Sequence, residues 1–400
     1  MDRHQTYETD AYARTLATTV IKVSEEGGRH CAILEDTILY PEGGGQPCDL
    51  GTIGEAAVLG VAHGPGGIVH FTDRPLEPGP VEVCLDWGRR RDHMQQHTGQ
   101  HLLTALAQDR FGWATTAFHL GTEVCDIELD APQILDRERL ELEDAVAAEI
   151  SAGRAVTASW VSRDEYDALH VRSRGLPEGH EGDIRLVAIE GLDTNTCGGT
   201  HLARTSELEG VKLLGVEPIR GGTRLFFVFG KRLRARLEAH EKRNHHLRTA
   251  LGRPDDGLAE AVEQRLAREK DLERALRHAD TELASAYAKA MLAGTDAFIT
   301  HHFESKDAAF LQKLTRVLLD AEKESNAAGR LYFFTAEMGG ERFFSLAAGG
   351  ACKADLPALG RSIAAILGGR GGGSSRQFQG KFSDIGKLAD ARDMVAAALP

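Results

Sequence analysis

The sequence predicts a multidomain α+β protein, and three observations support this prediction. The chain has 400 residues, which is more than one hydrophobic core usually supports. Short apolar runs alternate with glycine and proline near the N terminus, and strand-like and helix-like segments alternate in the middle. A long helical stretch rich in Arg, Glu, Ala and Leu follows. We therefore expect four domains, at residues 1–88, 89–230, 231–293 and 294–400.

Residues 1–88 are expected to form an antiparallel β-barrel. Turn residues separate short apolar runs, which are typical of strands; the runs cover residues 32–34, 37–40, 60–62, 67–71 and 81–85. Residues 40–47 (YPEGGGQP) form an unusual loop with two interpretations. It is either a flexible hairpin, or a loop whose bare N–H groups and Gln46 amide approach a ligand, with Glu42 as an acid or base.

Residues 89–230 are expected to form an α+β sandwich. An amphipathic helix is predicted at about 90–111, because Leu102, Leu103 and Leu106 recur at helical spacing and Gly112 follows. Other segments alternate like strands or have helical periodicity; strands are predicted at 124–129, 184–189 and 223–230, and a helix at 136–152.

The last two predicted domains are a helical hairpin and a C-terminal α/β domain. Helices are expected at about 231–251 and 258–292, because glycine and proline interrupt the pattern between them. Their apolar spacing also permits pairing with a second subunit, so a homodimer through the helical or C-terminal region is an alternative. Beyond Gly294, strand-like runs at 331–334 and 343–346 precede a glycine-rich segment at 368–373.

Two short motifs predict a metal site. His97 and His101 are four residues apart, as are Cys197 and His201, and a helix would place each pair on one face. His93 precedes His97 by the same spacing, so spacing alone does not decide which histidines take part. Nitrogen and sulfur donors favour Zn²⁺ over Mg²⁺ or Ca²⁺, which prefer oxygen. A metalloprotease is excluded, because the glutamate that follows its first histidine is replaced here by Thr98.

Two basic segments suggest contact with phosphate. Residues 368–381 contain no acidic residue, and we expect Arg370, Arg376 and Lys381 to contact phosphate together with the backbone of Gly371, Gly372 and Gly373. A flexible linker is the alternative. Arg89, Arg90 and Arg91 form a second cationic stretch beside the histidine helix; the alternative is a solvated helix terminus.

Composition limits the compartment and the partners. No apolar run approaches the roughly 20 residues that span a bilayer, and the first residues are polar, so a cytoplasmic protein without a membrane partner is expected. The six cysteines show no Cys-x-x-Cys pattern, which is typical of a reducing compartment. The net charge of -13 argues against indiscriminate nucleic-acid binding.

The order of the glycine-rich loop, the segment 94–103 (MQQHTGQHLL) and the segment 197–201 (CGGTH) resembles the editing domain of alanyl-tRNA synthetase and its free-standing AlaX relatives. The helices and the glycine-rich run at 368–373 resemble the DHHA1 domain that follows it, as in the long AlaX proteins. The pair Gly99-Gln100 departs from the residues usual in the synthetase, so fine specificity is not carried over.

The resemblance implies a zinc-dependent deacylase that hydrolyses mischarged tRNA(Ala), chiefly Ser-tRNA(Ala) and also Gly-tRNA(Ala), in trans. It implies the zinc ligands His97, His101, Cys197 and His201, with Zn²⁺ either orienting the amino group or activating water. No aminoacylation is expected, because the catalytic half of the synthetase has no room ahead of the barrel. A non-catalytic tRNA-binding or scaffold protein with a structural zinc is the main alternative, and a hydrolase of small esters or amides is another.

The resemblance leaves the catalytic residues open. A hydrophilic pocket rejects alanine when its polar groups need the serine hydroxyl, and Thr115, Thr116 and Thr200 are candidates for this discrimination. Gln46 is a further candidate in the loop. The general base is undecided between Glu42 and a water on the metal.

Overall fold

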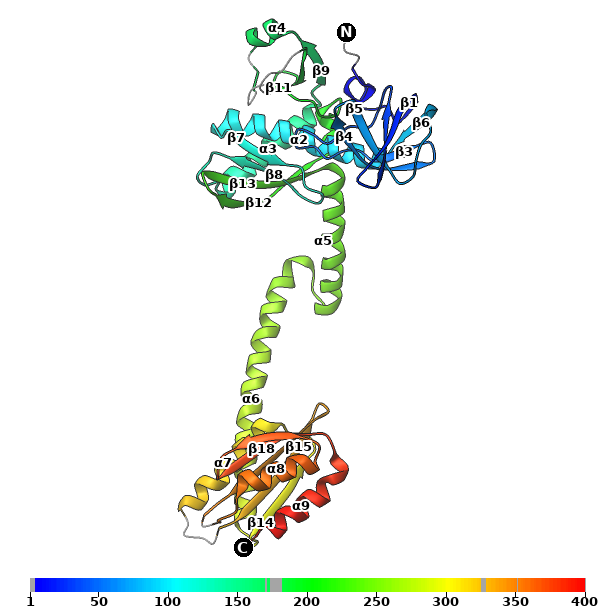
Figure 1. The fold of residues 1–400 in the computed structure, drawn as a ribbon. Coiled ribbons are helices and arrows are strands. Elements are labelled where there is room, and N and C mark those ends of the chain that lie inside the picture. The colour runs from blue at the N-terminus through cyan, green and yellow to red at the C-terminus, as the bar shows by residue number, and fades with distance from the viewer. Residues whose placement is uncertain (1–3, 170, 173–181, 325–328, 351, 400) are drawn as a thin grey trace. The chain divides into compact units, whose positions relative to one another are not determined.

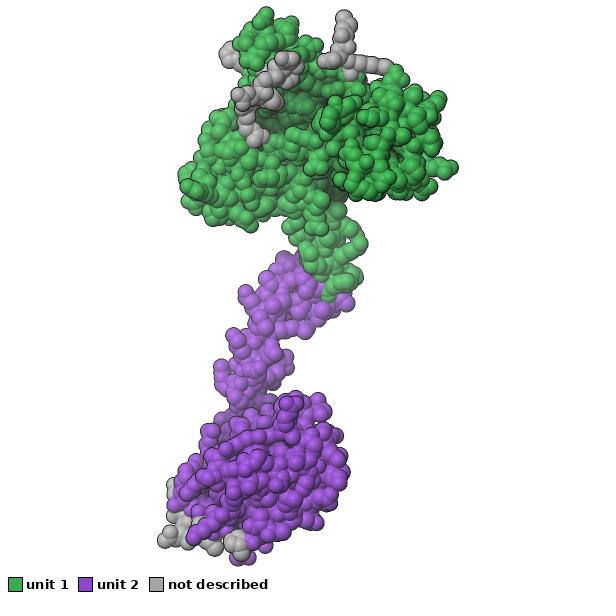
Figure 2. Space-filling model, viewed as in Figure 1, with its two compact units in different colours: residues 1–246 green, residues 247–400 purple. Residues whose placement is uncertain are grey.

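The computed structural model describes residues 4–169, 171–172, 182–324, 329–350 and 352–399. It consists of two compact units, residues 1–246 and 247–400 (Figure 2). The first unit contains a β-barrel and a mixed α+β part, and the second contains a helix-flanked sheet (Figure 1). The mixed α+β fold is therefore confirmed, while the division into four domains stays a prediction.

The N-terminal barrel is closed and antiparallel, with the strand order β1-β2-β5-β4-β3-β6. A short helix α1 (Thr6–Thr9) precedes it, and the strands are β1 (Thr15–Glu26), β2 (Arg29–Leu34), β3 (Gly51–Ile53), β4 (Ala56–Gly64), β5 (Gly67–Thr72) and β6 (Gly79–Leu85). Buried apolar side chains from these strands fill its interior, as the alternating pattern of each strand requires.

The strand predicted at residues 37–40 is wrong. These residues are irregular, because side chains rather than a neighbouring strand bind their backbone: the Leu39 N–H donates to Thr37 Oγ1 at 3.0 Å, and the Tyr40 N–H donates to Asp49 Oδ2 at 2.8 Å. Ile38 and Leu39 are nevertheless fully buried, so the apolar run marks a core segment without strand geometry.

The middle part is organised around α2 (Trp87–Phe111), which carries the histidine motif. It begins three residues before the predicted start, because Asp86 caps it by accepting a hydrogen bond from the Arg89 N–H, and it ends at Gly112 with a φ of 73°. At Gly99 a Cβ would lie 2.4 Å from the Phe229 ring. The glycine therefore lets α2 lie directly against the sheet.

Two antiparallel sheets accompany α2. The four-stranded sheet has the order β12-β13-β8-β7 and the three-stranded sheet the order β11-β10-β9. The elements are β7 (Thr115–His119), β8 (Cys125–Leu129), α3 (Asp136–Ala152), β9 (Val156–Val161), α4 (Arg163–Ala168), β10 (Ile184–Ile189), β11 (Asp193–Thr196), η1 (Thr205–Leu208), β12 (Val211–Ile219) and β13 (Gly222–Phe229). Helices α2 and α3 share one apolar core with both sheets.

The predicted helical region contains α5 (Gly230–Leu251), η2 (Asp255–Gly257) and α6 (Leu258–Leu292), close to the predicted bounds. Because the boundary between the units falls within α5, the arrangement as a hairpin stays a prediction. Among the described residues, no helix has both the length and the apolar character needed to cross a bilayer.

The second unit is built on a five-stranded sheet with the order β14-β15-β16-β18-β17, in which only the pairing of β14 with β15 is parallel. Its elements are β14 (Phe298–Phe303), α7 (Ala308–Glu324), β15 (Leu331–Met338), β16 (Glu341–Ala348), α8 (Leu356–Ile366), β17 (Arg370–Gly373), β18 (Gln377–Phe382), η3 (Ile385–Lys387) and α9 (Leu388–Ala397). One core joins the sheet to α8 and α9, and another joins it to α6 and α7.

The glycine-rich segment is an edge strand and not a flexible linker. Residues 370–373 form β17, which pairs with β18. A Cβ on Gly373 would lie 2.0 Å from the Gln377 carbonyl oxygen, so glycine is needed for the close approach of the two strands. Assignment of this unit to the DHHA1 domain stays a prediction.

Candidate metal centre and its cavity

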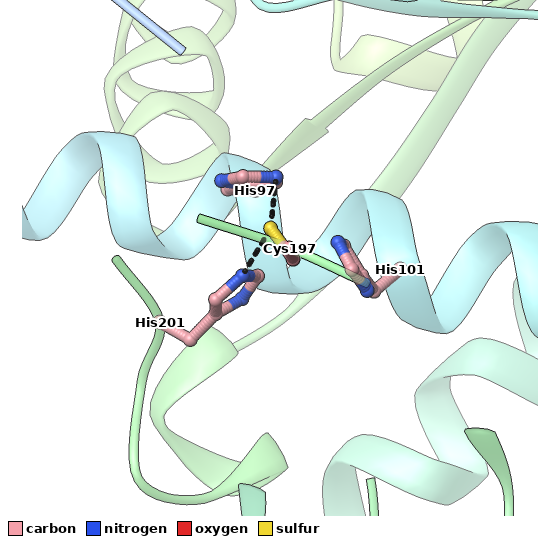
Figure 3. Close-up of side chains that lie close together, drawn as sticks. All are labelled: His97, His101, Cys197 and His201. Carbon is pink, nitrogen blue, oxygen red and sulfur yellow. Dashed lines mark hydrogen bonds between the residues drawn. The ribbon is translucent and has the colours of Figure 1, made fainter. Parts of the chain in front are cut away.

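The structure brings the four predicted ligands together. His97 and His101 lie on α2, and Cys197 and His201 lie in the loop after β11 (Figure 3). One ligand atom of each residue lies within 4.8 Å of the others, and Cys197 Sγ is 3.5 Å from His97 Nε2 and 3.2 Å from His201 Nε2. A tetrahedral zinc ion would hold sulfur and nitrogen about 3.6 Å apart. The donor set and its spacing therefore fit zinc, and His93 is not part of the cluster.

Residues 197–201 form a loop, so the helical i, i+4 geometry that would suit the spacing of Cys197 and His201 is not what brings them together. Arg185 holds this loop by donating from Nη1 to the carbonyl oxygens of Cys197 at 2.7 Å and Gly199 at 2.9 Å. A Cβ on Gly199 would lie 2.3 Å from His97 Cε1. The glycine thus permits the loop to reach the helix, and Cys197 and His201 meet through loop geometry.

Gln46 from the glycine-rich loop orients His97. Its Oε1 lies 2.8 Å from His97 Nδ1 and accepts from the Thr200 N–H at 3.1 Å, while its Nε2 donates to Thr200 Oγ1 at 2.9 Å. These contacts fix which amide atom faces the histidine, so His97 carries its proton on Nδ1 and directs the Nε2 lone pair toward Cys197. The sequence analysis expected the Gln46 amide to approach a bound molecule. In the structure it instead contacts His97, one of the candidate metal ligands.

We expect the Gln46→Leu variant to bind zinc about 10–100-fold more weakly, because His97 would lose the acceptor that fixes its tautomer. Competition against a chromophoric chelator measures this affinity. The control is Gln108→Leu, since Gln108 lines the same cavity. Equal zinc affinity in the two variants would contradict the orienting role of Gln46.

His201 and His101 each also have a polar side chain near ring atom Nδ1, and the sequence analysis missed both of these side chains. Thr98 Oγ1 lies 3.1 Å from His201 Nδ1, and Asp193 Oδ2 lies 3.7 Å from His101 Nδ1. Arg172 Nε is 3.3 Å from Asp193 Oδ1. The only signal in the sequence was proximity, because Thr98 lies inside the first motif and Asp193 shortly before the second.

The cluster favours a thiolate. Burial alone would raise the pKa of the Cys197 thiol, but the charges of His97 and His201 and hydrogen bonds from His101 and His201 lower this pKa well below its usual value. The thiolate is the form of cysteine that binds metals. The site is therefore suited to a divalent cation.

The cluster opens onto a cavity of about 740 Å³, a volume typical of small-molecule sites. Its lining comes from the barrel, from α2, from the start of β7 and from the loop that follows β11. His97, His101 and Cys197 are among the lining residues. A bound ion would therefore face the cavity, and a ligand there would contact both the barrel and the α+β part.

The candidate catalytic residues differ in their positions. Thr115 lines the cavity; Thr116 does not, and its Oγ1 donates to the Glu128 carbonyl at 3.3 Å. Thr200 is fully buried against Gln46. Glu42 is exposed and does not line the cavity. Of the four, Thr115 is thus the one placed to contact a ligand in the cavity.

Thr115 belongs to a polar chain that the sequence analysis missed. Gln100 Nε2 donates to Thr104 Oγ1 at 2.8 Å, and Thr104 Oγ1 lies 3.0 Å from Thr115 Oγ1. All three residues line the cavity beside His101. These side chains therefore present hydroxyl groups to any small polar group that enters the cavity.

The cationic stretch at residues 89–91 is largely structural. Arg90 is fully buried and pairs with Asp49, and Arg91 Nη2 donates to Glu209 at 2.8 Å. A buried, paired guanidinium is not available to phosphate, so the predicted role fails for Arg90. Arg89 alone faces a cavity.

The predicted tRNA-binding residues lie on the β17–β18 edge of the second unit. Arg370 and Lys381 are register partners and line one hollow, while Arg376 lines another with Arg316 and Lys323. Lys381 pairs with Glu341. Gly371, Gly372 and Gly373 lie in β17, so part of their backbone is used in the sheet.

Comparison with known proteins gives consistent matches. The family model described as the threonyl and alanyl tRNA synthetase second additional domain matches residues 184–226. The chain is 34% identical over 403 residues to the mouse alanyl-tRNA editing protein Aarsd1, covering 96% of each chain, and 36% identical over 366 residues to its zebrafish counterpart, covering 90% of this chain and 87% of that one. It is also 26% identical to the alanine–tRNA ligase of Pyrococcus abyssi, covering 98% of this chain and 43% of that one.

Proposed function

Because the chain belongs to the family of alanyl-tRNA editing proteins, we propose that it hydrolyses mischarged tRNA(Ala) in trans, chiefly Ser-tRNA(Ala) and also Gly-tRNA(Ala). We propose in addition that hydrolysis needs Zn²⁺ bound by His97, His101, Cys197 and His201, and that the protein does not charge tRNA. Incubation with ATP, alanine and tRNA(Ala) should then yield no Ala-tRNA(Ala).

The observation that carries the proposal is the position of the cluster. Three of its four members line a cavity whose volume suits the aminoacylated end of an RNA. A purely structural zinc site is normally closed by its ligands, whereas a catalytic site faces its substrate. A ligand in this cavity would lie directly against the cluster.

The residues of the chain supply binding and orientation. A divalent ion bound by the cluster would supply Lewis-acid chemistry next to the ester. Gln46 and Thr98 hold His97 and His201 in position, and the Gln100–Thr104–Thr115 chain faces the amino-acid side chain of the substrate. Glu8 is the one carboxylate among the described lining residues, and its Oε2 accepts from the Gln5 N–H at 2.7 Å.

Discrimination against alanine follows from the polar chain. The hydroxyl of serine can use the hydrogen-bonding capacity that Thr104 and Thr115 have left beyond their bond to each other, whereas the methyl group of alanine would cover these hydroxyls without using it. A site built to bind a hydroxyl rejects the analogue that lacks it much more strongly than an apolar pocket does. Correctly charged Ala-tRNA(Ala) would thereby be spared.

We expect the Thr104→Val/Thr115→Val variant to lower kcat/KM for Ser-tRNA(Ala) about 10-fold and to leave the rate with Ala-tRNA(Ala) unchanged or higher, because only serine loses a hydrogen-bond partner. Release of labelled amino acid measures both rates. Thr116→Val is the matched control, since Thr116 lies outside the cavity lining. If the ratio of the serine to the alanine release rate is unchanged in the double variant, the hydroxyls of Thr104 and Thr115 do not discriminate between the two substrates.

We also propose that the second unit binds the body of the tRNA through Arg370 and Arg376, with the glycines of β17 allowing close approach. Support comes from the hollows that these arginines line. Lys381 is a weaker candidate, because it pairs with Glu341. A homodimer through the helical or C-terminal region stays a prediction, and so does a cytoplasmic location.

The presence of four protein ligands also favours the alternative of a structural zinc in a tRNA-binding scaffold. Metal removal separates the two proposals. If the ion is catalytic, chelated protein that remains folded should still bind tRNA but release no serine, and added Zn²⁺ should restore release. A scaffold would release no serine in either state.

A further inference from the structure

A second cavity lies next to the first within the same unit. Its volume is about 430 Å³, and its lining comes from the end of the glycine-rich loop, the first two turns of α2, the segment after β7 and the N terminus of α5. His93 lines it, slightly more than one helical turn or about 6 Å along α2 from His97 in the first cavity. The two cavities therefore lie beside the same helix.

The contact between Gly45 and Phe118 lies close in sequence to residues that line both cavities. A Cβ on Gly45 would lie 2.6 Å from the Phe118 ring, so the loop lies directly on this aromatic side chain. Gly43, Gly44 and Phe118 line the first cavity, whereas residues just beyond the contact, Pro47 and Leu120, line the second. A chain-like ligand whose end enters the first cavity could pass this contact and reach the second.

Basic groups without a charge partner face the second cavity. Arg89 uses Nε to donate to the Cys48 carbonyl at 3.0 Å, and among the described residues its terminal nitrogens have no hydrogen-bond partner. The Lys231 ammonium also has no ion-pair partner in the described part of the chain. Arg232 and Asp92 neutralise each other, and Asp86 is used as the cap of α2. Asp86 keeps its negative charge as a cap, so the lining carries a net charge of +1 in a protein of net charge -13.

The electrostatics of α5 and a buried histidine add to these cations. Lys231 and Arg232 belong to the first turn of α5, a helix of 22 residues whose N terminus carries partial positive charge. His93 is 5% exposed, and its buried Nδ1 has no hydrogen-bond partner among the described residues. Burial and Arg89 lower the pKa of His93 to about 4, so it is neutral and able to donate one hydrogen bond. This buried nitrogen without a partner calls for an explanation, and a ligand bound at the cavity wall that His93 lines would supply one.

We infer that this second cavity binds a backbone phosphate of the RNA whose aminoacylated end occupies the first cavity. Arg89 and Lys231 supply the charge, and His93 supplies a hydrogen bond. The inference rests on the proposed function, because that function makes the ligand an RNA. The sequence analysis expected the stretch 89–91 to contact phosphate. In this inference only Arg89 of that stretch does so, together with Lys231, which is distant in sequence.

The test compares Arg89→Gln/Lys231→Gln with Lys231→Gln alone, in which the contact of Arg89 with Cys48 is kept. Binding of uncharged tRNA(Ala) is measured over a range of salt concentrations. We expect the double variant to bind about 10-fold more weakly at low salt, with a slope of log K against log[salt] that is shallower by about 0.7–0.9, which corresponds to one phosphate contact. Lys231→Gln should show part of both effects. The matched control is Lys22→Gln/Arg220→Gln, which removes the same charge from exposed positions elsewhere in the unit.

A substrate without phosphate makes the test specific. Hydrolysis of seryl-adenosine should be the same in the cavity variants and in the wild type, while KM for Ser-tRNA(Ala) rises. Equal salt slopes in the double variant and its charge control would overturn the inference. Binding is measured without hydrolysis, so a wild type that binds but does not hydrolyse would contradict the proposed function and leave the phosphate contact supported. No binding of tRNA by the wild type would overturn both.

Discussion

Replacing Cys197 by alanine is expected to remove zinc from the protein and to lower serine release from Ser-tRNA(Ala) by about 100-fold or more. The sulfur lies within 3.5 Å of two of the three histidine nitrogens, so its loss leaves only nitrogen ligands in an open arrangement. Loss of a direct ligand should exceed the 10–100-fold effect that is typical of residues behind the ligands. Metal content by mass spectrometry and single-turnover hydrolysis measure the two effects.

The matched control is Cys84→Ala, which removes a half-buried free thiol from the barrel. This variant should keep both zinc and activity. A Cys197→Ala protein that retained one zinc ion per chain and full activity would remove Cys197 from the metal centre. A protein that lost zinc but kept its activity would show that hydrolysis does not need the ion.

Replacing Arg90 by methionine is expected to destabilise the first unit by about 3–5 kcal/mol, because Asp49 would then be a buried charge without a partner. Arg90 Nε donates to Asp49 Oδ2 at 2.9 Å, and both side chains are fully buried. The guanidinium also donates to the Ala11 carbonyl at 2.8 Å and to the Ile38 carbonyl. It therefore ties α2, which carries the candidate ligands His97 and His101, to the barrel. Chemical denaturation of the full chain measures the loss.

The double variant Arg90→Met/Asp49→Leu tests the reason for this loss. Replacing both members of a buried ion pair by apolar residues is often close to neutral, so the double variant should recover much of the stability lost in Arg90→Met. A double variant that is less stable than Arg90→Met would show that the hydrogen bond which Asp49 accepts from the Tyr40 N–H, and not the unpaired charge of Asp49, dominates.

The clustering of His97, His101, Cys197 and His201 could be predicted from the sequence because the chemistry of these residues is specific. Cysteine and histidine at a spacing of four, in two separate motifs, suggest one ion whatever the local structure. At residues 197–201 two glycines let the backbone bring Cys197 and His201 to the cluster without helical geometry. Periodicity likewise predicted α3 and α6 with the bounds that the structure shows.

Contacts between distant segments could not be predicted in the same way. Gln46 and His97 are 51 residues apart, and only the docking of the barrel on α2 makes them partners. Arg90 lies in a run of three arginines, which normally indicates a solvated surface, yet the helix turns it into the core. Residues 37–40 have the composition of a strand, but Thr37 and Asp49 satisfy their backbone groups instead. Each failure arises because a tertiary contact replaced the local preference.

The central claim is tested most directly by measuring the release of labelled serine from Ser-tRNA(Ala) by the zinc-loaded protein, with Ala-tRNA(Ala) measured in parallel. The account predicts rapid release of serine, little release of alanine, and loss of serine release when the ion is chelated from folded protein. Release of serine no faster than in buffer, from folded and zinc-loaded protein, would contradict it.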